Sequence, residues 1–116
     1  QYEDLADTSM EESSETIRER IIKARKRQEE RYQGLGILTN SQLNVRQIEK
    51  FCQIQEADKC IMKQAYERLE LSARTYQKVL AVARTIADLE GTEEIEAKHL
   101  REALSYRTME YRQGRN

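Results

Sequence analysis

The sequence contains no proline and no tryptophan, and only one phenylalanine and four glycines among its 116 residues. Without proline, no residue lacks the amide proton that a helix interior needs, and few glycines leave few flexible positions. The abundant glutamate, arginine, glutamine, alanine and leucine lose little rotamer freedom in a helix. The composition therefore predicts an all-α fold, and the length suits one domain with a modest core.

Long apolar runs are also missing. None approaches the ~20 residues of a membrane span, and the N-terminus lacks the charged and then apolar order of a signal peptide. No sign of charge dominates, because 20 basic residues stand against 21 acidic ones. The 35% of charged residues and the mean hydropathy of -0.90 therefore do not exclude folding. We expect a soluble, cytoplasmic protein with no membrane partner.

Residue types that carry chemistry are scarce. Cys52 and Cys60 are the only cysteines, and His99 is the only histidine. A zinc site normally needs four ligands, so we assign no metal ligand and predict that both thiols are buried. A general base needs positioned partners, and none is indicated for His99, which favours a structural or exposed histidine. The chain also lacks a G-x-x-x-x-G-K-[ST] phosphate loop, so alone it is not predicted to be an enzyme.

The chain divides into three segments. Residues 1–12 have neither periodicity nor an apolar face and are interpreted as an acidic linker from an upstream domain. Residues 13–110 are predicted to form a compact bundle of about five helices, with Ser13 or Ser14 capping the first helix. Residues 111–116 are interpreted as a tail.

The helical period of 3.6 residues predicts which side chains face the core. Gly34 is expected to end the first helix, Asn44 and Gln47 to cap the second, and Ile95 to act as a hydrophobic staple for the fifth. Outside the fourth helix, the predicted core positions are Ile17, Ile21, Ala24, Gln28, Leu35, Ile37, Leu38, Val45, Ile48, Phe51, Cys52, Ala57, Cys60, Ile61, Ala65, Leu69, Ala97, Leu100, Ala103 and Leu104.

The fourth helix is "LSARTYQKVLAVARTIADLEG", in which Ser72 is expected to cap the start and Gly91 to end the helix. Its apolar face is centred on Ala83, and Arg74 points directly away from that face. The other members of the apolar face are Tyr76, Val79, Leu80, Ile86 and Ala87. An arginine gains nothing from the helix dipole here, because this end favours anions by roughly 0.3–1 kcal/mol.

Two interpretations of Arg74 remain open on spacing alone. A phosphate supplied from outside would suit a guanidinium beside the free amides of a helix start. An ordinary surface arginine paired to Glu70 or Asp88 is favoured by the spacing.

Six cations of the first helix form a basic cluster: Arg18, Arg20, Lys23, Arg25, Lys26 and Arg27. Such a cluster could neutralise nucleic-acid phosphates. However, the cations wrap around the polar face, glutamates interrupt them, and no aromatic residue lies between them for base stacking. A solvated helix surface is favoured over a DNA-binding surface.

Four segments carry a family resemblance: "SSETIRERIIKARKRQEERY", "NSQL", "LSARTYQKVLAVARTIADLEG" and "IEAKHLREALSYR". In this order and spacing they resemble the C-terminal helical domain of the magnesium-chelatase-like AAA+ ATPases, specifically the bacterial ComM type. The resemblance implies a lid that packs over ATP and Mg²⁺ held by an upstream α/β domain, with Arg74 as the sensor 2 arginine at the terminal phosphates. The phosphate loop, the magnesium-binding acids and the arginine finger of the family have no counterpart here, so the chain alone is expected to bind no cofactor.

The same resemblance implies partners and a motor function. The full-length protein is expected to be an ATP hydrolase that assembles as a hexamer and moves on branched DNA during recombination. The alternatives are the lid of a true magnesium chelatase, which acts on a porphyrin, and a free-standing helical module that binds protein or DNA.

Overall fold

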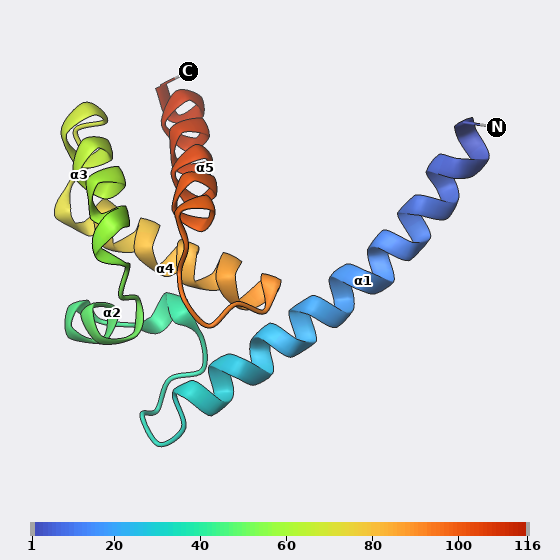
Figure 1. Cartoon of the computed structure of the whole chain (residues 1–116), viewed down its shortest axis with the longest axis horizontal. Helices are drawn as coiled ribbons and strands as arrows, with labels where there is room; N and C mark the ends of the chain where they lie inside the picture. Colours follow the sequence, from blue (N-terminus) through green and yellow to red (C-terminus); the bar gives the residue numbers. More distant parts are fainter. Residues whose placement is uncertain (1, 116) are drawn as a thin grey trace.

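The computed structural model of the chain is all-α (Figure 1), and it describes the backbone of residues 2–115 and the side chains of residues 14–107. Within these residues the five α-helices are α1 (Tyr2–Arg31), α2 (Val45–Phe51), α3 (Lys59–Arg68), α4 (Ala73–Glu90) and α5 (Ala97–Arg115). Two single turns of 3-10 helix, η1 (Asn40–Gln42) and η2 (Glu56–Asp58), precede α2 and α3. The predicted fold class is confirmed.

Helix α4 is the centre of the bundle and packs against α1, α2, α5 and η1. Figure 1 shows α3 and α5 side by side on one side of α4, while α1 leaves from the other. The predicted ends of α4 are confirmed, because Ser72 Oγ accepts from the Thr75 amide and Gly91 adopts the left-handed conformation with φ of 90°. This conformation is easy for glycine and lets the Gly91 amide bond the last carbonyls of the helix.

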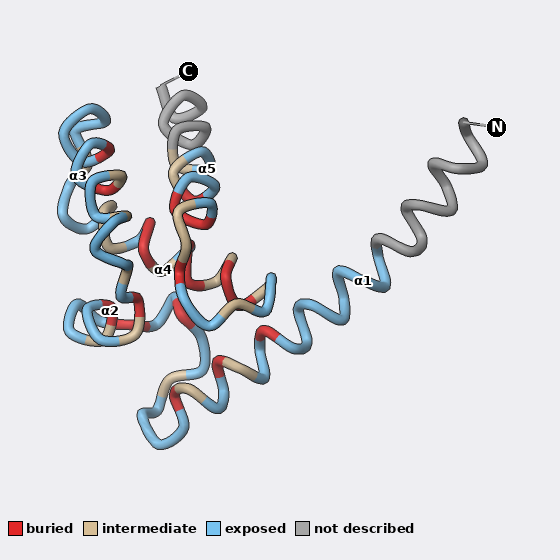
Figure 2. Tube along the Cα trace, viewed as in Figure 1, coloured by how far each residue is buried: buried red, intermediate tan, exposed pale blue. Residues whose placement is uncertain are grey.

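The core lies where α2, α3 and α5 converge on α4 (Figure 2). Val79, Leu80 and Ala83 of α4 are buried as predicted, while Tyr76 and Ile86 are half-buried against them. Leu100 and Ala103 of α5 complete the predicted apolar contact. The 3.6-residue pattern was sufficient here because both helices have one broad apolar face.

Helix α1 differs most from its prediction. It begins at Tyr2, so the prediction that Ser13 or Ser14 caps it is wrong. Ala24 and Gln28 are buried, but Ile17 and Ile21 are exposed because residues 14–23 extend beyond the bundle. The periodicity found the correct face, but it could not show where along α1 that face stops being covered. The predicted linker 1–12 and tail 111–116 fall outside the described side chains.

The loop after α1 packs through a different residue than predicted. Leu35 and Leu38 are exposed, which contradicts their predicted burial, and only Ile37 packs against the core. Asn40 is buried instead, for reasons given below. The Asn44 side chain and Gln47 form the predicted capping box of α2, although Val45 is exposed rather than buried.

Helix α3 faces the core through Met62 and Ala65. The predictions for Ala57, Cys60 and Leu69 are wrong, since all three are exposed. The helix is preceded by η2, and its buried face is centred on Met62, which the prediction did not include. Of the two thiols only Cys52 is buried, and burial raises its pKa to about 11, so it stays protonated at neutral pH.

Ile95 joins α5 to the core. It is fully buried with Leu100, as expected for a staple residue, and it forms an isolated parallel β-bridge with Ile54. No strand is formed between residues 2 and 115. Of the helices described, none combines the length and hydropathy that crossing a membrane requires.

Candidate functional site

An open groove of about 580 Å³ lies between α2, α4 and α5. Its apolar part includes Val45 and Val82, which are 49% and 40% exposed. Its polar part includes the cations Arg74, Lys78 and Arg107. None of the described residues that line the groove is an aspartate or a glutamate. The groove therefore combines positive charge with accessible apolar surface, a combination that suits an anionic ligand with an apolar part.

Arg74 is the second residue of α4 and lies exposed on the groove wall. The pairing to Glu70 or Asp88 that its spacing favoured is absent, because Arg74 has no ion pair within residues 14–107 and Asp88 is occupied by other arginines. The prediction that Arg74 faces away from the apolar core is confirmed. Its guanidinium is available to an external anion.

The start of α4 is held against α5 beside this arginine. Ser72 Oγ donates to Thr75 Oγ1 at 3.0 Å, and Arg107 Nη2 donates to the same oxygen at 3.4 Å. The turn that carries Arg74 is thus tied both to its own cap and to α5. A fixed start of α4 fixes the direction from which Arg74 can reach a ligand.

The opposite end of α4 contains a buried ion-pair network around Asp88. The Asp88 side chain is fully buried and accepts two hydrogen bonds from Arg31 of α1, at 2.6 and 2.9 Å. Arg84, one turn earlier on α4, lies 3.1 Å from the same carboxylate. The hydrogen bonds with Asp88 raise the pKa of Arg31, which favours the charged guanidinium.

Asn40 of η1 completes this network. Its side-chain amide donates to Asp88 Oδ2 and to Thr85 Oγ1, both at 3.0 Å, and its carbonyl oxygen accepts from the Tyr32 hydroxyl. The Asn40 backbone amide donates to the buried Gln28 side chain at 3.1 Å. Every polar group of this buried asparagine has a partner, so it connects the loop to both α1 and α4.

Arg84 also closes the end of α4. Its guanidinium donates to the backbone carbonyls of Thr92 and Glu93 at 2.8 and 2.6 Å. The Nε atom has no partner within the described part of the chain. We call Arg31, Asn40, Arg84 and Asp88 the α1–α4 joint, because together they fix the direction in which α1 leaves the bundle.

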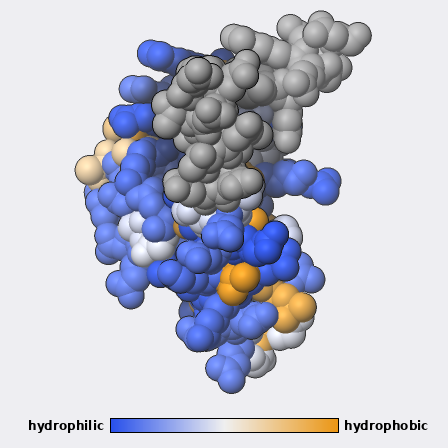
Figure 3. All heavy atoms as spheres, turned by 90° about the vertical axis from the view of Figure 1, so that its right-hand side faces the viewer, coloured by the Kyte–Doolittle hydropathy of each residue, from blue (hydrophilic) through white to orange (hydrophobic). Residues whose placement is uncertain are grey.

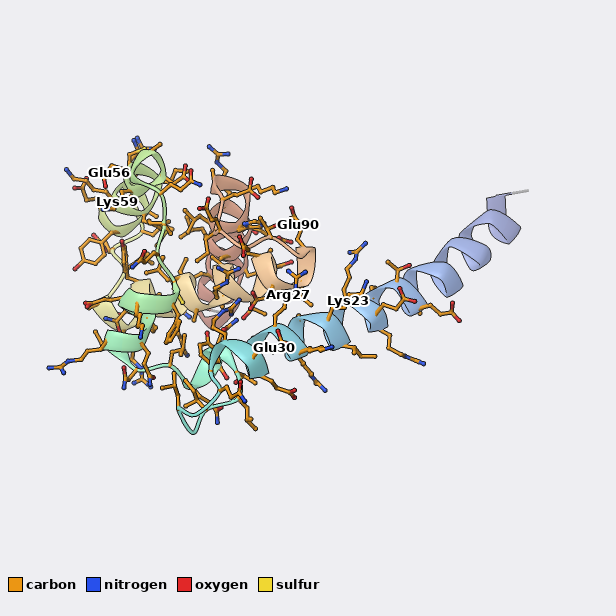
Figure 4. All side chains as sticks on the ribbon, turned by 60° about the horizontal axis from the view of Figure 1, so that its bottom comes forward. Lys23, Arg27, Glu30, Glu56, Lys59 and Glu90 are labelled. Atoms are coloured by element: carbon orange, nitrogen blue, oxygen red, sulfur yellow. The ribbon has the colours of Figure 1, made fainter. Side chains whose placement is uncertain are left out.

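The basic cluster of α1 lies away from the groove. Arg18, Arg20, Lys23, Arg25 and Lys26 are exposed, and Lys23 lies on the part of α1 beyond the bundle (Figure 4). Arg27 is half-buried and packs near Gly91, so it belongs to the contact between α1 and α4. Figure 3 shows that the face seen along α1 is mostly hydrophilic, with small apolar patches.

His99, Glu90 and Glu96 place three metal-ligand atoms within 4.8 Å of one another. However, His99 Nδ1 accepts the Glu96 amide proton at 2.8 Å, so the ring proton lies on Nε2 and is donated to Glu90 at 3.1 Å. A metal on Nε2 would force that proton onto Nδ1, against the amide. Lys98 also binds Glu90, and the hydrogen bonds from Lys98 and His99 lower the pKa of Glu90. The cluster is therefore a hydrogen-bonded clamp between α4 and α5, and His99 is structural.

Sequence reasoning missed the joint, and it gave no role to the other groove cations, Lys78 and Arg107. Arg84 and Asp88 are four residues apart at the edge of the apolar face, which is a recognisable pairing signal. Asn40 had no such signal, because its partners come from segments distant in sequence.

Residues 11–107 match the sequence model of a family described as magnesium chelatase, subunit ChlI C-terminal. The chain is 41% identical over 98 residues to competence protein ComM of Haemophilus influenzae, covering 84% of this chain and 18% of that protein. It is 40% and 38% identical over 99 residues to the YifB proteins of Salmonella typhimurium and Escherichia coli, covering 85% of this chain and 19% of each. The chain thus spans about a fifth of the length of these relatives, and it belongs to the magnesium chelatase ChlI C-terminal family, as a ComM-type member.

Proposed function

We propose that this chain is the lid of a AAA+ ATPase, which closes over ATP and Mg²⁺ bound by an upstream α/β domain. The observation that carries the proposal is Arg74, which is exposed at the start of α4 and lines a groove whose described lining has no carboxylate. Because no acid neutralises it, the guanidinium can bind the terminal phosphates of a nucleotide held by another domain. In this role Arg74 is the sensor 2 residue.

The chemical consequence is charge stabilisation during phosphoryl transfer. A guanidinium fork at the β- and γ-phosphates stabilises the negative charge that spreads over the equatorial oxygens. The contact also differs between ATP and its products, so the position of the lid depends on the nucleotide state. Because Arg74 lies on the central helix of the bundle, its movement carries the whole domain.

The α1–α4 joint supports the mechanical part of the proposal. Helix α1 leads from the N-terminal side of the chain and is held to α4 by the ion pair of Arg31 with the buried Asp88. A rigid connection of this kind would transmit lid rotation to a preceding domain. We propose that the complete protein acts as a hexamer and moves along branched DNA.

Nucleotide turnover by the full-length protein tests the Arg74 role. We predict that Arg74→Ala lowers the rate of ATP hydrolysis by roughly 10²-fold, as expected for the loss of one donor to the transferred group. The matched control is Arg101→Ala, an exposed arginine of α5 outside the groove lining. Unchanged turnover in Arg74→Ala would refute the sensor assignment.

DNA binding is tested separately on the basic cluster. Five cations of the cluster are exposed and form no ion pair among residues 14–107, which leaves them free to contact phosphates: Arg18, Arg20, Lys23, Arg25 and Lys26. If this domain contacts DNA, affinity should fall steeply with salt, and Arg25→Ala with Lys26→Ala should reduce the slope by about two. A salt-independent affinity, or no effect of the double change, would restrict DNA contact to other parts of the protein.

A further inference from the structure

Lys78 is a second cation on the groove wall whose role is not explained by the proposed function. It follows Arg74 by four residues, so the two side chains leave the same face of α4 about 6 Å apart along the helix axis. Both are exposed and line the groove. Neither has an ion pair with any residue from 14 to 107, and like charges at this spacing repel each other.

The rest of the groove lining strengthens the attraction of Arg74 and Lys78 for an anion. Beside the cations it offers neutral polar groups, including Ser41, Asn44 and Gln77, and no described lining residue is acidic. A concave surface of one charge raises the local concentration of counter-ions more than a convex one does. An anion that reaches both cations would also remove their mutual repulsion.

We propose that Lys78 is a second phosphate-contacting residue, which together with Arg74 makes the α4 wall of the groove a polyphosphate-binding site. This inference rests on the proposed function, in which Arg74 meets the terminal phosphates. Arginine supplies a planar fork and lysine a compact charge with rotatable donors, so the pair can contact two adjacent phosphate groups of one ligand. A monophosphate would reach only one of them.

The basic cluster of α1 provides a built-in comparison. It contains more cations than the groove does, but they lie on a convex helix surface that also carries Glu19, Glu29 and Glu30. If net positive charge were sufficient, a small polyanion would bind α1. If the shape and lining of the groove matter, the same anion would bind next to Arg74 and Lys78.

Titration of the 116-residue chain with inorganic tripolyphosphate at low salt, followed by amide chemical shifts, separates these cases. We expect the largest shifts in the groove segments of α4 and α2. Lys78→Ala should weaken binding about fivefold, Lys78→Arg should restore it, and the control Lys63→Ala, on the exposed side of α3, should have no effect. Shifts confined to residues 18–27, or equal affinities of Lys78→Ala and Lys63→Ala, would overturn the inference.

ATP affinity and turnover of the full-length protein distinguish failure of this inference from failure of the proposed function. We expect Lys78→Ala to weaken ATP binding about fivefold and AMP binding less, while Arg74→Ala lowers turnover. If only Arg74→Ala has an effect, the lid function stands and the role of Lys78 is wrong. If Lys78→Ala weakens tripolyphosphate binding but Arg74→Ala leaves turnover unchanged, the groove binds anions and the lid function is wrong.

Discussion

The two ends of α4 use charged residues in opposite ways. At the C-terminal end Arg84 and Asp88 are buried, and Asp88 bonds Arg31 and Asn40 from other elements. At the N-terminal end Arg74 and Lys78 are exposed, repel each other and have no acidic partner among residues 14–107. The same helix therefore contains one set of charges paired within the fold and one set that is hydrated and open to an external anion.

Burial and pairing separate the charges of α4 that stabilise the fold from those that are open to a ligand. A buried ion pair is costly to break, because removing one partner leaves the other without solvent and without compensation. An exposed, unpaired cation contributes almost nothing to the fold, so it can be changed without unfolding the protein. If this comparison is correct, stability should be sensitive to changes at one end of α4 and nearly insensitive at the other.

The largest expected effect comes from Asp88→Ala. The change leaves Arg84, which is 4% exposed, without its carboxylate and removes both hydrogen bonds that Arg31 donates to it. We predict a loss of about 3–5 kcal/mol in the free energy of unfolding, measured by urea denaturation. Much of the stability of a small domain would be lost.

The matched control is Glu67→Ala, which removes an exposed carboxylate from α3. We predict that its free energy of unfolding changes by less than about 0.5 kcal/mol. Equal effects of the two substitutions would mean that the buried network is not what holds α1 to α4.

An intermediate effect is expected at the cap of α4. Ser72→Ala removes the side-chain oxygen that accepts from the Thr75 amide at 3.1 Å and the hydroxyl that donates to Thr75 Oγ1. Loss of such a cap costs about 1 kcal/mol. Ser72→Asp keeps a hydrogen-bond acceptor and should retain most of the stability. Equal melting temperatures of Ser72→Ala and Ser72→Asp would show that the cap does not hold the helix start.

The sequence predicted the parts of the fold that depend on local physics. The cap at Ser72, the left-handed Gly91 and the capping box of Asn44 and Gln47 are formed by residues within four positions of one another, so the sequence contains the whole interaction. The apolar faces of α4 and α5 were also correct, since each is broad and repeats with the helical period.

The wrong predictions share a different cause. Ile17, Ile21 and Leu38 are apolar residues that the fold leaves exposed, and hydrophobicity alone does not tell which faces find a partner. Conversely, Asn40 and Asp88 are polar residues that are buried because partners from three separate elements satisfy them. Hydrogen bonds between segments distant in sequence cannot be inferred from one segment at a time.

The candidate site was predictable only as far as it depends on one helix. The orientation of Arg74 follows from the phase of one helix, and its role came from the family resemblance. The groove itself is formed by α2, α4 and α5 together, so its cation-rich, acid-free lining was visible only once these elements were assembled.

The smallest expected change in the free energy of unfolding is that of Lys78→Ala, which should stabilise the domain where the other substitutions destabilise it. Removing one of two like charges at i and i+4 relieves repulsion, so Lys78→Ala should stabilise the domain by about 0.2–0.5 kcal/mol at low salt. The gain should shrink as the ionic strength rises to 1 M, where the screening length falls to about 3 Å.

The control is Lys63→Ala, which removes an exposed lysine of α3 and accounts for the change in helix propensity. If urea denaturation shows the same salt-independent gain in both variants, propensity explains it and Arg74 and Lys78 do not repel each other. If only Lys78→Ala gains, and the gain disappears with salt, the chain retains an unfavourable pair of charges at its groove, as expected where stability is given up for binding.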